Sequence, residues 1–239
     1  MGIIIFNGQS SEDYNVMVEH KPDYEHPEKD YDIIHVPGRN GDIIVDKGSW
    51  KNTTRSYDIA FHSIHDKDFV YTASGVSQWL HAPSGYARLE DSYEPEYYRM
   101  AVYKESGSFT NILAEAGRAT ISFDCKPQRF LKSGESIHKL IKETYLKNPT
   151  AYDSLPKIII YGSGSGVLTI NGSIINISSI GNGMVIDSEL QDAYHGTSNW
   201  NKNITLNDRR FPKLKAGENL ISFSGGITSV EVIPRWWTL

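Results

Sequence analysis

The sequence predicts a mainly β fold, with two β domains and a single short helix. Aromatic residues make up 11% of the 239 residues, and they include 14 Tyr, 8 Phe and 5 Trp. Twenty Gly and ten Pro supply turn residues at short intervals, and apolar side chains alternate with period two between them. Aromatic and β-branched residues favour strands, while frequent turn residues keep strands short. Hydrophobic residues at 39% and charged residues at 22% are sufficient for a packed core.

Residues 1–130 are expected to form the first domain. Within it, residues Ser74–Leu80 predict the short helix, because Val76, Trp79 and Leu80 recur on one helical face. Ser74 is the candidate N-cap, and Pro83-Ser84-Gly85 ends the helix. The runs predicted as strands are Ile3–Phe6, Tyr14–Glu19, Tyr31–Val36, Ile43–Val45, Ser56–Phe61, Ala87–Leu89, Tyr97–Tyr103 and Ala119–Phe123.

A hairpin is predicted within residues 31–61. Pro37–Asp42 separates the β-branched pair Ile33-Ile34 from the run Ile43–Val45. Asn40-Gly41 favours positive φ at two successive residues, which suits a tight hairpin turn. We therefore expect either a hairpin or a long protruding β-arm.

Residues 131–156 are expected to connect the two domains. Ser136–Tyr145 has weak helical spacing of Ile137, Leu140, Ile141 and Tyr145, and Pro149 and Pro156 follow it. Proline-bounded, polar segments are typical of connections between domains.

Residues 157–239 are expected to form a second domain with the strand spacing of a β-sandwich or jelly roll. Gly162–Gly166 is interpreted as a flexible turn, and Asn171-Gly172 as a hairpin turn. Strands are predicted at Lys157–Tyr161, Val167–Ile170, Ser173–Ile177, Gly183–Asp187, Asn203–Leu206, Asn219–Phe223 and Ser229–Ile233.

Charge and cysteine content exclude several classes of protein. The net charge of −5 argues against wrapping of nucleic acid. Residues 1–130 carry 13 Lys and Arg against 20 Asp and Glu, whereas residues 131–239 carry 11 against 9, so the two parts are expected to face different surroundings. The single cysteine, Cys125, excludes an intrachain disulfide and favours folding in a reducing compartment. We expect neither a secretory signal nor a membrane span.

Three segments were considered as sites of chemistry. His62–Asp68 holds two His and two Asp, but they leave a strand, where positions i and i+3 face opposite sides. Asp187–Asp192 with His195 lacks the order of acids around a central glycine that a calcium loop requires. Gly162–Gly166 lacks the third glycine of a dinucleotide fingerprint and the Lys-Ser/Thr of a phosphate loop. The sequence therefore predicts no catalytic residue, no metal site and no cofactor.

Aromatic residues of the second domain leave two alternatives open. They could form an exposed sugar-stacking platform, or they could fill the core or a subunit contact. A carbohydrate-binding module that recognises host cell-wall sugars is thus the alternative function, and no local motif supports a hydrolase. The residues concerned are Trp200, Trp236, Trp237, Tyr152, Tyr161 and Tyr194.

Several segments resemble the distal tail proteins (Dit) of siphoviruses, which are phages with long non-contractile tails. The similar blocks occur in order along nearly the whole chain. They are Phe6–Gly8, Ser10–Tyr14, Val36–Asp42, Leu89–Arg99, Phe123–Gln128, Phe211–Asn219 and Ile233–Trp237.

The resemblance implies a structural virion protein at the tail tip, made in the cytoplasm of a bacterial host. In that family the N-terminal domain forms a ring, reported as hexameric, around a channel below the tail tube. The C-terminal domain is galectin-like and points outward, where receptor-binding or baseplate proteins attach. The implied partners are other copies of the chain, the tail tube protein, tail-tip proteins and adhesins, with DNA only in transit. Known relatives mostly infect Gram-positive bacteria.

Structural roles are expected for seven residues. Pro37, Gly38, Arg39, Asn40 and Gly41 would shape an arm that crosses a neighbouring subunit. Trp236 and Trp237 would anchor the C-terminus, either in the second domain or on the first.

Overall fold

The computed structural model describes residues 2–62, 69–104, 110–113 and 116–239 and is mainly β, as predicted. The chain divides into two compact units. Unit 1 comprises Met1–Arg129 together with Leu239, and unit 2 comprises Phe130–Thr238. The chain therefore leaves unit 1 after Arg129 and returns to it with its last residue.

Unit 1 is built on one curled sheet. Its strands follow the order β2-β1-β7-β8-β10-β6-β3, and β9 and β20 also pair with β10. The sheet curls until Gly2 forms an antiparallel bridge with Val18 of β3, through N–H···O bonds of 3.1 and 2.9 Å. The strands are β1 (Ile4–Phe6), β2 (Gln9–Ser10), β3 (Val16–Val18), β6 (Thr53–His62), β7 (Ala87–Asp91), β8 (Tyr97–Tyr103), β9 (Thr110–Leu113) and β10 (Ala116–Leu131), and a 3-10 turn, η1, covers Ser11–Tyr14. The last two residues of β10 and the whole of β20 (Trp237–Thr238) belong to unit 2.

The α-helix of unit 1, α1, spans Phe69–His81 and packs on the core of the curled sheet. Val76, Trp79 and Leu80 are at most 1% exposed, so the predicted helical face is confirmed. Trp79 donates its indole N–H to the carbonyl of Phe6 at 3.1 Å and stacks on Tyr14. Ser74 is wrong as the N-cap: it lies inside the helix, where its hydroxyl accepts a hydrogen bond from Gln78.

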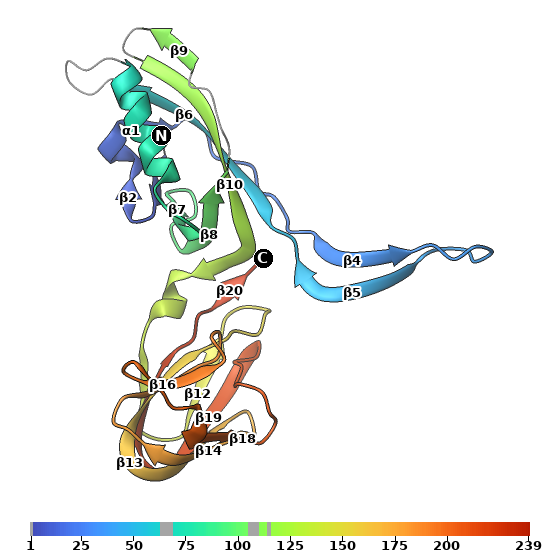
Figure 1. Cartoon of the computed structure of the whole chain (residues 1–239), viewed down its shortest axis with the longest axis vertical. Helices are drawn as coiled ribbons and strands as arrows, with labels where there is room; N and C mark the ends of the chain where they lie inside the picture. Colours follow the sequence, from blue (N-terminus) through green and yellow to red (C-terminus); the bar gives the residue numbers. More distant parts are fainter. Residues whose placement is uncertain (1, 63–68, 105–109, 114–115) are drawn as a thin grey trace. The chain divides into compact units, whose positions relative to one another are not determined.

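The predicted hairpin is present as a separate two-stranded sheet of β4 (Lys29–Ile34) and β5 (Ile43–Trp50). Figure 1 shows these strands extending away from the curled sheet of the same unit. We call residues 29–50 the arm. The run Ser56–Phe61, predicted as the end of the hairpin, belongs instead to β6 in the curled sheet.

Unit 2 is a continuous sheet that is folded on itself around two long central strands, β13 (Lys157–Ile170) and β19 (Gly217–Ile233). The first half of β13 pairs with β15, and its second half pairs with β14. Both halves contribute to one apolar core, which also contains Trp236. The other elements are β11 (His138–Leu140), β12 (Thr144–Asn148), β14 (Ser173–Ile180), β15 (Met184–Asp187), β16 (Asp192–His195), β17 (Ser198–Asn199), β18 (Ile204–Leu206) and the 3-10 turns η2 (Lys132–Glu135) and η3 (Asn201–Asn203).

Glycines make the fold of this sheet possible. Gly162–Gly166 was expected to be a turn, but these residues are a bulged stretch inside β13. The register with β19 shifts there, opposite Gly225 and Gly226. By contrast, Asn171-Gly172 does form the predicted hairpin turn: both residues have positive φ, 51° and 83°, and Ile170 pairs with Ser173 across them.

Residues 131–156, expected to be a connection, contain two strands of unit 2. β11 and β12 pair with opposite ends of β19, and Leu140 and Leu146 join the core. The predicted helical stripe does not form: Ile137, Ile141 and Tyr145 are 59%, 72% and 64% exposed. The central strand β19 has an open edge here, and pairing with it satisfies backbone groups that a free linker would leave to water.

Candidate assembly interface

The arm turns at Pro37-Gly38, not at Asn40-Gly41. The amide of Arg39 donates to the carbonyl of Val36 at 3.2 Å, and Gly38 has φ +79°. Proline before a residue of positive φ is the signature of a type II turn. Asn40 keeps a negative φ and only Gly41 is positive, at +80°, so the two residues do not form the tight hairpin turn that we expected. Residues 35–42 form a longer tip instead.

Ion pairs hold the register of the arm. Lys29 lies 2.8 Å from Asp46 on one face, and Lys47 lies 2.8 Å from Asp32 and 3.4 Å from Asp30 on the other. At the tip, His35 Nδ1 lies 3.0 Å from the Asp42 carboxylate. These pairs are exposed, so solvent screening leaves each with only a small stabilising effect on the hairpin.

Both faces of the arm carry exposed apolar side chains. Residues that pair across an antiparallel ladder share a face, which places Ile33 and Ile44 together on one side. Ile33 is 67% exposed and Ile44 is 64% exposed. Ile34 and Val45 lie on the other side. Ile34, which pairs with Ile43, is 49% exposed, and Val45 is 44% exposed. In sequence this arrangement appears as unbroken β-branched runs without polar alternation, which is the signal that distinguishes it from an ordinary surface strand.

Such an arm is suited to binding protein. An isolated two-stranded hairpin is only marginally stable in water, and exposed clusters of large apolar side chains mark interaction surfaces. In the described part of the chain, neither β4 nor β5 pairs with a third strand, so their outer edges can accept another strand. Pro37, Gly38, Arg39, Asn40 and Gly41 all lie exposed at its tip.

The C-terminal tryptophans lie in unit 2. Trp236 is 3% exposed within its core, and its carbonyl accepts a hydrogen bond from the amide of Leu131. Trp237 stacks on Tyr152 with ring centroids 4.6 Å apart and donates its indole N–H to the carbonyl of Asp153. Both side chains therefore contact residues of unit 2, and their role as an anchor of the C-terminus stays a prediction.

The six aromatic residues considered for sugar stacking do not form a single platform. Trp236 is buried, and Trp200 packs against the core beside His195. The Tyr161 hydroxyl donates a hydrogen bond to the Glu231 carboxylate. Tyr152 and Trp237 stack on each other instead. Two of these rings, Trp236 and Trp200, therefore serve packing within unit 2.

The two acidic segments of the sequence, Asp187–Asp192 and His62–Asp68, were candidates for a metal site. Asp187 is 1% exposed and pairs with both terminal nitrogens of Arg235, at 2.7 and 2.8 Å, so it is part of the internal packing. Residues 63–68 of the segment His62–Asp68 lie outside the described residues.

Among the described residues, no group of three or more His, Cys, Asp and Glu is placed to hold a metal ion. Within the same residues, no helix has both the length and the apolar character needed to cross a bilayer.

The chain is similar to a protein of known structure. No protein-family model matches the sequence, and no curated protein matches it. Among solved structures, the chain is similar to the Dit protein of phage SPP1, with a TM-score of 0.78, 14% identity and coverage of 100% of both chains. That protein is described as a paradigm of the hub adsorption apparatus in phages that infect Gram-positive bacteria. The chain thus shares the fold of that protein over the full length of both chains.

Proposed function

We propose that this chain is a distal tail protein: a structural, non-enzymatic virion component whose copies form a ring, a hexamer by the resemblance, at the tip of a non-contractile phage tail. The ring joins the tail tube to the host-adhesion proteins and lets DNA pass. The observation that carries the proposal is the likeness to SPP1 Dit over the full length of both chains. The chain is made in the cytoplasm of its bacterial host and acts in the virion.

The arm supplies the contact between copies in this proposal. Burying its exposed apolar side chains is favourable, and a neighbouring copy of unit 1 provides apolar surface and strand edges for this contact. Head-to-tail contacts of this kind close into a ring when the rotation between copies divides a full turn. The acidic composition of the first 130 residues suits a channel, because like charge keeps DNA phosphates from adhering to the wall.

An arm variant tests the proposal. The double substitution Ile33→Asp with Ile44→Asp places two charges on one exposed face of the arm. We expect the melting temperature to stay within about 2 °C of the wild type, because neither side chain is in a core. Rings seen by negative-stain microscopy, with the chain alone or co-expressed with its tail tube and tip proteins, should disappear in favour of monomers.

The matched control is Leu190→Asp, which charges an equally exposed apolar residue in unit 2. It should leave ring formation unchanged. A wild-type chain that remains monomeric in the presence of its tail proteins would contradict the ring, and rings that survive the arm substitutions would contradict the role of the arm.

A further inference from the structure

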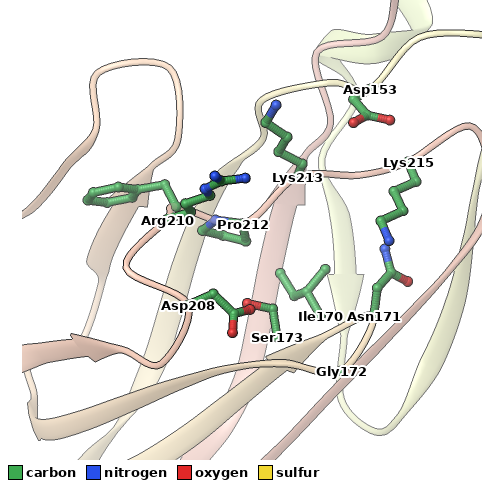
Figure 2. Close-up of a pocket in the computed structure, with 11 residues that line it drawn as sticks. Asp153, Ile170, Asn171, Gly172, Ser173, Asp208, Arg210, Pro212, Lys213 and Lys215 are labelled. Carbon is green, nitrogen blue, oxygen red and sulfur yellow. The ribbon is translucent and has the colours of Figure 1, made fainter.

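Unit 2 contains two adjoining hollows around the loop between β18 and β19. The larger has a volume of about 690 Å³ and the smaller about 430 Å³. They share Arg210, Phe211 and Lys213 in their walls. Figure 2 shows the larger one, with Lys213 and Asp153 on one side of an open space and Asp208 and Ser173 on the opposite side.

The smaller hollow is strongly basic. Its wall contains Arg209, Arg210 and Lys213 and no carboxylate. In the part of the chain that the structure describes, none of these three side chains makes an ion pair, whereas Arg235 in the same unit is paired with Asp187. Three unpaired cations in one concave wall produce a positive potential that an anion would neutralise.

A buried hydroxyl in the same wall has no partner. Ser188 is 1% exposed, and its Oγ makes no hydrogen bond. The residue is held in place on both sides: its amide donates to Pro156, and the preceding Asp187 accepts from the amides of Glu189 and Leu190 while pairing with Arg235. A buried hydroxyl without a hydrogen-bond partner is destabilising, so a ligand oxygen that accepts from Ser188 would be favoured.

The larger hollow has a mixed chemistry. Arg210, Lys213 and Lys215 line it together with the carboxylates of Asp153 and Asp208, and Ser173 offers a hydroxyl. Phe211 and Pro212 add apolar surface. Carboxylates that accept hydroxyl hydrogens beside an apolar ring are suited to a polyhydroxylated molecule, because its hydroxyl groups and C–H faces need both kinds of contact.

We propose that these hollows form a binding site for a phosphorylated carbohydrate, with the phosphate in the smaller hollow and the sugar in the larger. A phosphate ester carries a charge of about −1.5 to −2 and three acceptor oxygens, which matches three cations and the Ser188 hydroxyl better than a single carboxylate does. Arginine donates to such oxygens in bidentate pairs. This site is distinct from the aromatic platform considered from the sequence, and it goes beyond the proposed structural role.

A titration of the full chain tests the site, with amide chemical shifts of residues 207–211 and 213–216 followed by NMR. The probes are glucose 1-phosphate, glucose, inorganic phosphate and a short poly-glutamate peptide. We expect saturable shifts with glucose 1-phosphate and weaker binding of glucose and of inorganic phosphate. Arg210→Gln should weaken glucose 1-phosphate binding by about tenfold or more, and Ser188→Ala by about threefold to tenfold.

Lys202→Gln is the matched control, because it removes an exposed cation of unit 2 that lies outside both hollows. It should leave the affinity unchanged, and all variants should keep the wild-type melting temperature. The site is overturned if glucose 1-phosphate gives no saturation, if poly-glutamate binds in its place, or if Lys202→Gln reduces the affinity as much as Arg210→Gln does. Equal affinity for inorganic phosphate would overturn the role of the sugar.

Discussion

At the scale of single residues, the bend of the long strands β13 and β19 in unit 2 requires glycines, which have no Cβ atom. A Cβ atom added to Gly226 would lie 1.8 Å from the carbonyl oxygen of Ser163, and no side-chain movement can relieve a clash with backbone. The bulges of β13 and β19 can therefore approach each other this closely only because glycine occupies the contact position. Without that approach, the halves of the two long strands could not fold over a common core.

Gly226→Ala is expected to destabilise unit 2 by roughly 2–4 kcal/mol, because the backbone must shift to admit the methyl group. Chemical denaturation monitored by Trp fluorescence would measure the loss. Ser163→Ala is the control: it removes an exposed hydroxyl from the same bend without adding a Cβ atom, and it should change stability by less than about 0.5 kcal/mol. If the two variants were equally stable, the close approach of the bulges would be wrong.

At the scale of elements, short segments acquire their roles from what they pair with. β11 and β12 are three and five residues long and have little strand character of their own, yet both pair with β19. The C-terminal segment is similar, because Trp236 fills the core of unit 2 and Arg235 pairs with the buried Asp187. Removing such a segment opens a cavity and leaves a buried carboxylate unpaired.

Truncation after Pro234 should therefore destabilise unit 2 by several kcal/mol and lower its melting temperature by more than about 10 °C. Trp236→Ala alone should account for about 3–5 kcal/mol of this loss, because the ring is 3% exposed. Trp237→Ala, which removes a half-buried ring, should cost less than Trp236→Ala. Calorimetry would measure all three, and an unchanged melting temperature in the truncated chain would contradict the anchoring role.

At the scale of the whole molecule, each unit has its own apolar core. The core of unit 1 contains two groups whose pKa is raised. Burial raises the pKa of the Cys125 thiol in unit 1 to about 12, from an ordinary value of 9.0. Burial, followed by the charge of Asp91, also raises the pKa of Tyr57 in the same core. Both groups stay protonated in the folded unit at a pH where the unfolded chain has lost these protons.

Because each unit has its own core, two unfolding transitions are expected in calorimetry. Raising the pH above about 9 should lower the melting temperature of the transition that belongs to unit 1. The unfolded chain binds fewer protons than the folded unit above about pH 9, so stability falls as pH rises from there towards 12. Cys125 alone can remove up to roughly 4 kcal/mol across that range. Cys125→Ala should flatten the alkaline dependence, and an equal response of both transitions would contradict the assignment.

Local patterns in the sequence determined the β class, the helical face of Val76, Trp79 and Leu80, the Asn171-Gly172 turn and the existence of the arm. Each of these depends on neighbours within a few residues, through side-chain period or the φ angles that glycine and asparagine adopt. The resemblance to distal tail proteins also came from the sequence, and the fold of SPP1 Dit agrees with it.

Contacts between distant residues decided the rest. The glycines of β13 became a bulge because β19 lies against them, and residues 131–156 became strands because β19 had an open edge. The hollows of unit 2 bring Leu155, Ser188 and Lys213 to one wall from separate segments. Whether a hydroxyl is buried without a partner, or a cation is left unpaired, depends on these distant neighbours. No local pattern contains that information, because the energy of burial is set by the surroundings that the fold supplies.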